Sequence, residues 1–299
     1  MIKEIKRLKK EKNAIILAHN YQVAEVQDVA DFVGDSFGLS RIAYESEATT
    51  IVFCGVHFMA ESAKILSPEK KVLLPVKEAG CPMADMITGE ALREFKTKNP
   101  GVPVVCYVNT SAEVKAESDI CCTSSNAVNV VNSLDSKKIL FVPDQNLGNY
   151  VAKQVPEKEI MLFRGFCIVH HRVEEEEVDD IRKRLPNVRI LAHPECKPEV
   201  INKSDFVGST SQILKEAKES KETEFIIGTE IGMLHALQKQ NPEKKFHILS
   251  PALVCENMKK TTLKDVYEAL KHDKNEITLD ENLRIRAKQS LERMLKIKE

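Results

Sequence analysis

An internal repeat with a period of about 86 residues constrains the fold of this chain more than any other feature of its sequence. Pro68, Pro156 and Pro242 each open a Pro-Glu-Lys segment, and they stand 88 and 86 residues apart. Each segment precedes an apolar run typical of a β-strand. Proline suits the turn before a strand because its φ is fixed and it donates no backbone hydrogen bond. Self-similarity at a fixed period indicates that one structural unit occurs three times.

Other parts of the sequence keep the same register, and together they predict the architecture of the unit. Apolar runs that read as strands recur at residues 15–19, 104–107 and 189–193, and again at 51–53, 139–142 and 225–228. These short, β-branched runs alternate with helical patterns, which predicts small parallel sheets covered by helices on both faces. Each unit is expected to run in the order helix, strand, turn of small residues, strand, helix, strand and cysteine.

We therefore predict an α/β protein of three repeated αβα sandwich units with pseudo-threefold symmetry and an active site at the central junction. Ligands bind at the carboxyl ends of the strands in open α/β sheets, and three units around one axis would point those ends at a shared centre. The predicted units span residues 1–86, 87–172 and 173–258, and residues 259–299 form a helical extension that breaks the repeat.

The composition is that of an ordinary globular protein and excludes several classes of function. Of the 299 residues 42% are hydrophobic and 30% charged, and the formal net charge is −1, so no global positive field attracts nucleic acid or an anionic membrane. No apolar run is long enough to span a bilayer, and residues 1–8 read as an amphipathic helix rather than a signal peptide. We expect a cytoplasmic protein, in which eight cysteines indicate metal or redox chemistry more than disulfides.

Three of the cysteines keep the register of the repeat. Cys81, Cys167 and Cys255 each follow the last predicted strand of a unit, and they stand 86 and 88 residues apart. Equivalent positions in three units converge near a common axis, and three thiolates suit a soft metal centre. A 4Fe–4S cluster normally takes four cysteines, so a cluster held by three would leave one iron open as a Lewis acid.

Two other interpretations of these cysteines stay open at this point. A zinc ion on the three cysteines would make the chain a lyase or hydrolase, although zinc sites usually contain a closely spaced cysteine pair. A metal or redox sensor without catalytic activity is the other alternative. The remaining cysteines are not expected to be ligands of the metal. Cys54 and Cys106 read as small core residues, and Cys121 and Cys122 as turn residues. Cys196, beside Glu195, is the one that could approach the site.

Pairs of polar residues two positions apart follow the first predicted strand of each unit. The pairs are His19 with Tyr21, Tyr107 with Asn109, and His193 with Glu195. Residues two apart in an extended strand lie on one face, so each pair can present an acid, a base or a hydrogen-bond donor to the shared centre. Ser36, Ser124 and Thr210 stand before predicted helices, where a hydroxyl either caps the helix or helps to bind an anion at its N-terminus.

These segments, taken as a set and in this order, resemble the signature segments of the quinolinate synthase family. The resemblance extends from about residue 13 to residue 260 and fits the shorter bacterial and archaeal form. Its position 166 is a departure, because Phe166 stands where family members often have histidine. The matching segments are His19-Asn20-Tyr21-Gln22, Gly34-Asp35-Ser36, Cys81-Pro82-Met83-Ala84, Tyr107-Val108-Asn109, His193-Pro194-Glu195-Cys196, Gly208-Ser209-Thr210 and Cys255-Glu256-Asn257-Met258-Lys259.

The resemblance implies an enzyme of the transferase class in the biosynthesis of NAD. Its reaction condenses iminoaspartate with dihydroxyacetone phosphate to quinolinate, with loss of phosphate and two waters. L-aspartate oxidase or aspartate dehydrogenase would supply iminoaspartate, and neither nucleic acid nor membrane would be a partner. The implied ligands of the 4Fe–4S cluster are Cys81, Cys167 and Cys255. The implied catalytic residues are Tyr21, Tyr107, His193 and Glu195. The implied substrate-binding residues are His19, Ser36, Tyr107, Val108, Asn109, Ser124, His193, Pro194, Glu195 and Thr210.

Overall fold

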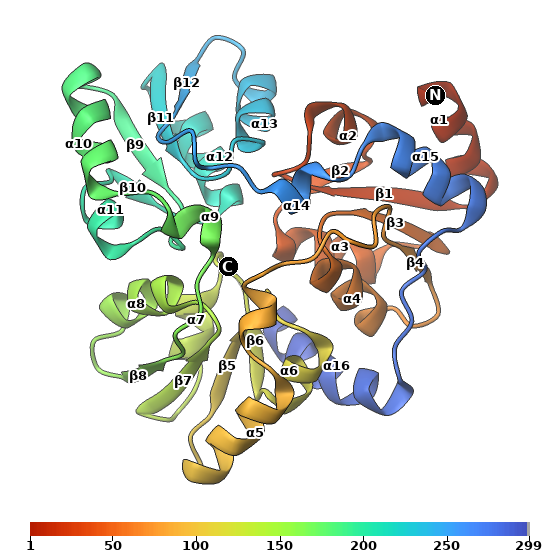
Figure 1. The fold of residues 1–299 in the computed structure, drawn as a ribbon, viewed down its shortest axis with the longest axis horizontal. Helices are drawn as coiled ribbons and strands as arrows, with labels where there is room; N and C mark the ends of the chain where they lie inside the picture. Colours follow the sequence, from red (N-terminus) through yellow and green to blue (C-terminus); the bar gives the residue numbers. More distant parts are fainter. Residues whose placement is uncertain (298–299) are drawn as a thin grey trace.

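The computed structural model describes residues 1–297, and these residues form three separate four-stranded parallel sheets (Figure 1). The strand orders are β2-β1-β3-β4, β6-β5-β7-β8 and β10-β9-β11-β12. In each sheet the first strand of the unit lies between the second and the third, and the fourth forms an edge. Because this order occurs three times and no sheet of residues 1–297 spans two units, the predicted α/β class with repeated αβα units is confirmed.

The first unit contains β1 (Ala14–His19), β2 (Phe32–Gly34), β3 (Thr50–Cys54) and β4 (Lys71–Leu73) with α1 (Ile2–Glu11), α2 (Ala24–Val29), α3 (Ser36–Glu45) and α4 (His57–Leu66). After the short 3-10 helix η1 (Ala84–Met86), the second contains β5 (Val104–Tyr107), β6 (Ile120–Cys122), β7 (Lys138–Val142) and β8 (Glu159–Leu162) with α5 (Gly89–Lys98), α6 (Ala112–Glu117), α7 (Ala127–Asn132), α8 (Gln145–Gln154) and α9 (Ile168–His171). The third contains β9 (Arg189–Ala192), β10 (Phe206–Val207), β11 (Glu224–Gly228) and β12 (Lys245–Ile248) with α10 (Glu175–Arg184), α11 (Pro198–Asn202), α12 (Thr210–Glu219), α13 (Met233–Gln240) and α14 (Glu256–Lys259).

The central strands are apolar along their whole length because helices cover both faces of each sheet. All five residues of β3 are buried, as are four of the five residues of β7 and of β11. A strand buried on both faces shows a continuous apolar run in place of alternation, which is why the sequence reveals these strands clearly. The three sheets fall one to each of the predicted ranges 1–86, 87–172 and 173–258, whose boundaries stay a prediction.

The prediction of three strands in each unit is wrong, because the structure has four. The missed strands are β2, β6 and β10, which lie where the sequence indicated a turn of small residues. They are only three, three and two residues long, and they form sheet edges, where one neighbouring strand is enough to hold them. A run this short carries too little periodicity for the sequence to distinguish a strand from a turn.

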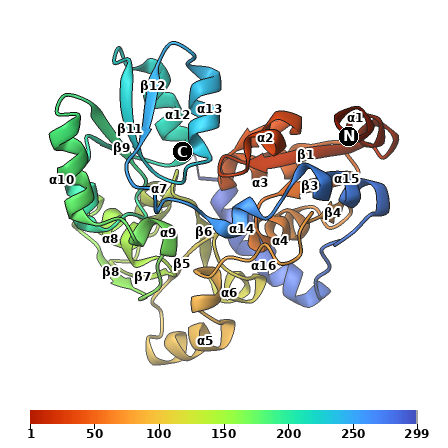
Figure 2. The ribbon, with the colours of Figure 1, turned by 45° about the horizontal axis from the view of Figure 1, so that its top comes forward.

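The C-terminal extension lies across the outside of the first two units (Figure 2). α15 (Leu263–His272) packs against α1 and β3, and α16 (Glu281–Leu295) packs against α6, β6 and α4. Ala287, Leu291 and Met294 of α16 are fully buried in the same core cluster as the second sheet. The extension therefore joins two units on the face away from their shared centre. Residues 298–299 of the predicted extension lie outside the described residues. None of the described helices is long and apolar enough to cross a membrane.

Candidate functional site

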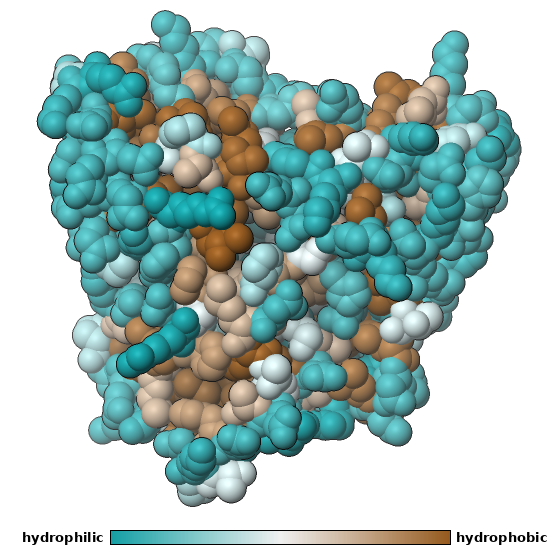
Figure 3. Space-filling model, in the orientation of Figure 1, coloured by the Kyte–Doolittle hydropathy of each residue, from teal (hydrophilic) through white to brown (hydrophobic). Residues whose placement is uncertain are grey.

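A cavity of about 210 Å³ lies where the three units meet, and every unit contributes to its lining. The space-filling view shows apolar side chains gathered near this centre on an otherwise mostly hydrophilic face (Figure 3). His19, Tyr107 and His193, which end or follow β1, β5 and β9, all line the cavity. The carboxyl ends of the three first strands therefore meet at one place, which agrees with the general location of ligands in parallel sheets.

Nearly all the residues singled out from the sequence line this one cavity. Those that do are His19, Tyr21, Ser36, Cys81, Tyr107, Asn109, Ser124, Cys167, His193, Glu195, Thr210 and Cys255. Val108 and Pro194 are buried behind their neighbours and are not among the residues that line it. The lining also includes residues that were not predicted as site residues, of which Asp35, His170, Arg172, Glu230 and Glu256 carry ionisable side chains.

The three repeat-related cysteines are free thiols, one from each unit. Cys167 and Cys255 are the N-cap residues of α9 and α14, and Cys81 lies in the loop between β4 and η1. Burial raises the pKa of Cys81 to about 12 and raises the pKa of Cys167 and Cys255 above the usual thiol value. Three thiols gathered in a desolvated cavity become thiolates when a cation compensates the charge.

Two buried carboxylates fix the backbone beside two of these cysteines. Asp144 accepts a hydrogen bond from the backbone N–H of Cys167 at 2.9 Å, and Glu230 accepts one from the N–H of Cys255 at 3.0 Å. Both carboxylates are fully buried and stand two residues after β7 and β11. The equivalent position in the first unit is Val56, which offers no such acceptor. The loops that carry Cys167 and Cys255 are thus held by hydrogen bonds from their backbone N–H groups to buried carboxyl groups.

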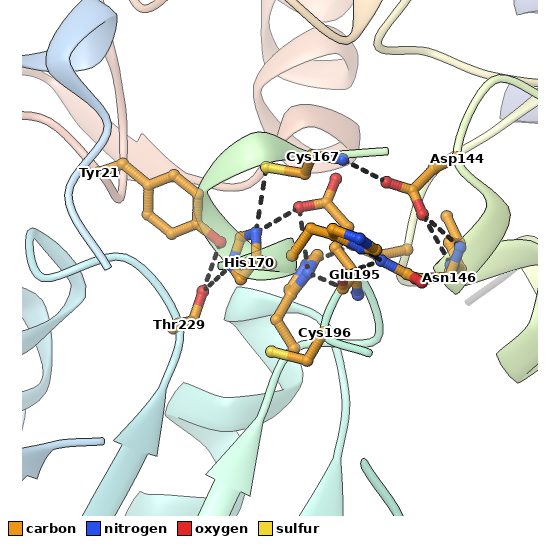
Figure 4. Close-up of polar contacts among 12 residues, drawn as sticks. Tyr21, Asp144, Asn146, Cys167, His170, Glu195, Cys196 and Thr229 are labelled. Atoms are coloured by element: carbon orange, nitrogen blue, oxygen red, sulfur yellow. Dashed lines mark hydrogen bonds and ion pairs between the residues drawn. The ribbon is translucent and has the colours of Figure 1, made fainter. Parts of the chain in front are cut away.

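Glu195 and His170 form the most tightly connected polar group of the cavity (Figure 4). Nδ1 of His170 lies 2.8 Å from Oε2 of Glu195 and 3.2 Å from Sγ of Cys167. The ligand atoms of Cys167, His170 and Glu195 all lie within 4.8 Å of one another, so this group could hold a metal ion. His170 was not singled out from the sequence, where no histidine stands at the equivalent position of the other two units.

Burial and hydrogen bonds set the protonation of the acid and base residues. Although burial opposes ionisation of Glu195, the neighbouring His193 and His170 and the hydrogen bonds donated by His170 and Tyr107 lower its pKa to about 2. Burial lowers the pKa of His193 to about 3 and that of His19 to about 4. At neutral pH the cavity therefore presents a carboxylate beside two neutral imidazoles.

Two buried oxygen atoms of the cavity lack a hydrogen-bond partner among the described residues. They are Oε1 of Glu195 and Oδ1 of Asn109. Leaving a buried acceptor unpaired is costly, and more so for a charged group. Both side chains line the cavity, so a ligand or cation bound there would satisfy them. Together with the three cysteines, they form a donor set that fits a metal centre.

Tyr21 reaches the site from the first unit and is held by residues of the third. Its hydroxyl lies 2.6 Å from Oγ1 of Thr229, which also lies 2.9 Å from Nε2 of His170. Its backbone carbonyl accepts a hydrogen bond from Lys259, whose ammonium pairs with Glu230 at 2.8 Å. Burial raises the pKa of Tyr21 well above its usual value, so the hydroxyl stays protonated and can donate.

The hydroxyl residues near helix starts are not the helix caps. Asp35 caps α3 and Ser209 caps α12, so Ser36 and Thr210 are the first helical residues. Ser124 lies in the turn before α7, where its hydroxyl lies 3.2 Å from Nε2 of His193. The capping role is thus wrong for these three hydroxyls. Ser36 and Thr210 line the cavity at the N-termini of ten-residue helices, where the helix dipole favours anions.

Comparison with known proteins shows the family to which the chain belongs. The chain matches the family model described as quinolinate synthetase A protein over residues 3–296. The chain belongs to the quinolinate synthase family. It is 64% identical to a quinolinate synthase of Alkaliphilus metalliredigens over 298 residues, which cover 100% of this chain and 98% of the relative. It is 56% identical to a quinolinate synthase of Caldicellulosiruptor bescii, covering 98% and 97%, and 57% identical to one of Clostridium kluyveri, covering 99% and 98%.

Membership of the quinolinate synthase family confirms the resemblance seen in the sequence. The repeat also contains a signal for two further residues of the site. Asp144 and Glu230 stand 86 residues apart, at the repeat spacing, and each follows the third strand of its unit. A comparison of the three units at every polar residue, and not only at those that follow the first strands, would have found this pair. No equivalent signal exists for His170, whose role depends on the packing of α9 against the third unit.

Proposed function

We propose that this chain condenses iminoaspartate with dihydroxyacetone phosphate to quinolinate, with loss of phosphate and two waters. Cys81, Cys167 and Cys255 would hold a 4Fe–4S cluster with one iron free of protein ligands. That iron would supply a Lewis acid for the two dehydrations. The activity belongs to the transferase class and to the biosynthesis of NAD.

One observation carries the proposal: three cysteines related by the repeat, one from each unit, line the same cavity as the acid, base and hydroxyl residues. A purely structural thiol needs no such neighbours, and a sensor would not need a carboxylate, two neutral imidazoles and two tyrosines around its metal. This combination of thiols with acid–base groups supports catalysis over sensing.

The spacing of the ligand atoms supports a cluster more than one zinc ion on the three cysteines. A tetrahedral zinc ion with Zn–S bonds of about 2.3 Å brings its sulfur ligands to about 3.8 Å from one another. Of the three cysteines, only Cys167 belongs to a group of three described ligand residues with atoms within 4.8 Å, and its companions there are His170 and Glu195. A cluster spans wider separations because each cysteine binds a different iron.

The acid–base steps fall to Glu195 and its neighbours. Its ionised carboxylate is positioned by His170 and Tyr107, and its free Oε1 can accept a proton from a substrate carbon or nitrogen. Tyr21 and Tyr107 keep their protons and can donate to a leaving hydroxyl or to a developing oxyanion. Neutral His193, with Ser124 at 3.2 Å, can move a proton in either direction.

The phosphate would bind at the N-termini of α3 and α12. Ser36 and Thr210 offer hydroxyls there, and helix N-termini stabilise anions through their free N–H groups and the dipole. Asn20 donates to Oγ1 of Thr210 at 2.8 Å, which leaves the hydroxyl proton of Thr210 available to the ligand. Both helices start at the cavity, so the leaving phosphate would be held beside the acid–base residues.

A second candidate arises from the group of Cys167, His170 and Glu195, whose composition suits a single zinc ion with an open position. On this reading the protein would be a zinc-dependent lyase or hydrolase. His170→Ala distinguishes the two, because it removes a ligand of the zinc site and no ligand of the proposed cluster.

Iron and sulfide analysis of anaerobically purified protein tests the proposal. We expect about four irons and four sulfides per chain, a broad visible absorption that bleaches in air, and quinolinate formation under argon. Cys81→Ser, Cys167→Ser and Cys255→Ser should each lose the cluster. The matched control is Cys54→Ser, a buried cysteine of β3 outside the cavity. One zinc per chain without sulfide, lost in His170→Ala, would contradict the cluster and favour the second candidate.

The source of iminoaspartate and the compartment belong to the same proposal. Iminoaspartate would come from L-aspartate oxidase or aspartate dehydrogenase through transient encounters, in the cytoplasm, where the eight free thiols described in the structure stay reduced.

A further inference from the structure

The binding of the proposed anionic substrates calls for a positive charge at the cavity, and the acid–base residues described above do not supply one. The lining of the cavity contains four carboxylates, those of Asp35, Glu195, Glu230 and Glu256. The proposed substrates are themselves anionic, since one carries two carboxylates and the other a phosphate. Like charges oppose entry into a partly desolvated site, so a cation at the cavity is needed to draw these substrates in.

Most groups that might supply the positive charge are unsuitable. His170 and His193 already face Glu195, at 2.8 and 3.4 Å, and Nδ1 of His19 accepts a hydrogen bond from the backbone N–H of Tyr21. Lys259, which is close by, already pairs with Glu230 and donates to the carbonyl of Tyr21. Among residues 1–297, Arg172 is the one lysine or arginine side chain that lines the cavity.

The position of Arg172 and its unpaired guanidinium suit the binding of a ligand. It follows α9 directly, as the C-cap residue of the helix whose N-cap is Cys167. Its side chain is exposed, so it stands at the mouth of the cavity and not in its depth. Within the described part of the chain its guanidinium makes no hydrogen bond or ion pair, although its backbone N–H donates to the carbonyl of His170. A guanidinium without a protein partner keeps its donors for a planar anion, which it can bind with two parallel hydrogen bonds.

We propose that Arg172 binds the anionic group of an incoming substrate at the mouth of the cavity and thereby sets the affinity for that substrate. The proposal rests on the proposed function, which makes the substrates anions. The group bound is a carboxylate or a phosphate, and these share the chemistry of two oxygens matched to one guanidinium. Arg172 is thus a substrate-binding residue, and the acid–base work stays with the residues deeper in the cavity.

The test compares Arg172→Gln and Arg172→Lys with a matched control in the loaded, anaerobic enzyme. The control is Arg164→Gln, which removes the same charge eight residues earlier. Arg164 is also exposed and without a partner among the described residues, but it does not line the cavity. The Michaelis constants for iminoaspartate and for dihydroxyacetone phosphate are measured separately, together with kcat, iron content and melting temperature.

We expect Arg172→Gln to raise the KM of one substrate about 10-fold, as the loss of a charge-assisted pair at a solvated site should. Iron content and melting temperature should match the Arg164→Gln control, because Arg172 has no protein partner to lose. Arg172→Lys should recover part of the affinity, since it restores the positive charge but not the two parallel hydrogen bonds of a guanidinium. The kcat/KM of the wild type should also fall more steeply with salt than that of Arg172→Gln.

The Michaelis constants of the two substrates identify the group that Arg172 binds. A raised KM for iminoaspartate assigns a carboxylate, and a raised KM for dihydroxyacetone phosphate assigns the phosphate. If both constants match those of Arg164→Gln, or if only kcat falls, the inference is overturned. A wild-type protein that holds iron and makes quinolinate while Arg172→Gln behaves like the control would refute this inference alone. A wild type that makes no quinolinate would refute the proposed function instead.

Discussion

Replacing Gly232 by alanine should disturb the contact between the first and third units at the edge of the site. A Cβ at Gly232 would lie 2.7 Å from the carbonyl carbon and oxygen of Tyr21 and 2.8 Å from Nζ of Lys259. Ordinary contact begins near 3.4 Å, so the backbone of Tyr21 must retreat by about 0.7 Å. Lys259 can move aside, because it is the far end of a flexible side chain, whereas the backbone of Tyr21 cannot do so cheaply.

The segment around Tyr21 resists this shift because several bonds hold it. Gln27 donates to the carbonyls of Gln22 and Gly232, at 2.8 and 3.0 Å, and so ties the first unit to the third. The Tyr21 hydroxyl is fixed on Thr229. We expect the overpacking to cost ~1–3 kcal/mol. Because the ring of Tyr21 lines the cavity, a displacement approaching 1 Å should lower kcat by about 10²-fold.

The assay combines urea unfolding with quinolinate formation under argon. The matched control is Gly34→Ala, whose Cβ would meet only Leu39 at 3.7 Å, an ordinary contact. Both variants change the backbone entropy of the unfolded chain in the same way, so their difference reports the steric contact. Iron content should stay at the wild-type level in both. If Gly232→Ala matched Gly34→Ala in stability and in kcat, the close approach of the two units at Tyr21 would be refuted.

The other predictions concern the acid–base residues. Glu195→Gln should keep its iron and lower kcat by about 10²–10⁴-fold, since it removes the proposed base; wild-type turnover in an iron-loaded variant would leave His193 or a tyrosine as the base. His19 has a pKa lowered to about 4 in the folded state, while the unfolded chain binds this proton near pH 6.5. Stability must therefore fall as the pH drops from about 6.5 to about 4, by about 3 kcal/mol from this group. His19→Asn should lose that much less over the same range in urea unfolding, and an unchanged pH dependence would show that His19 is not held neutral.

The sequence was informative wherever the repeat applied. Cys81, Cys167 and Cys255 were found by spacing alone, because three copies of one unit place equivalent residues at equivalent points. The central strands were equally clear, since a strand buried on both faces is apolar throughout. The helical pattern predicted for residues 259–299 corresponds to α15 (Leu263–His272) and α16 (Glu281–Leu295). The edge strands β2, β6 and β10 were not predicted, because two or three residues are too few to show the hydrophobic periodicity of a strand.

By itself, then, the sequence determined the α/β class, the threefold repetition of the unit and the membership of the quinolinate synthase family. These features depend on local patterns and on their spacing along the chain. Only the tertiary structure decided that His170 lies beside Glu195, that Asp144 and Glu230 hold the backbone of two cysteines, and that Arg172 faces the cavity. Each of these is a contact between segments far apart in the sequence or a matter of exposure. The contact between His170 and Glu195 follows from how the second and third units pack against each other, whereas the bonds of Asp144 and Glu230 follow from how the loops after the third and fourth strands fold within one unit. No local pattern of the sequence encodes either.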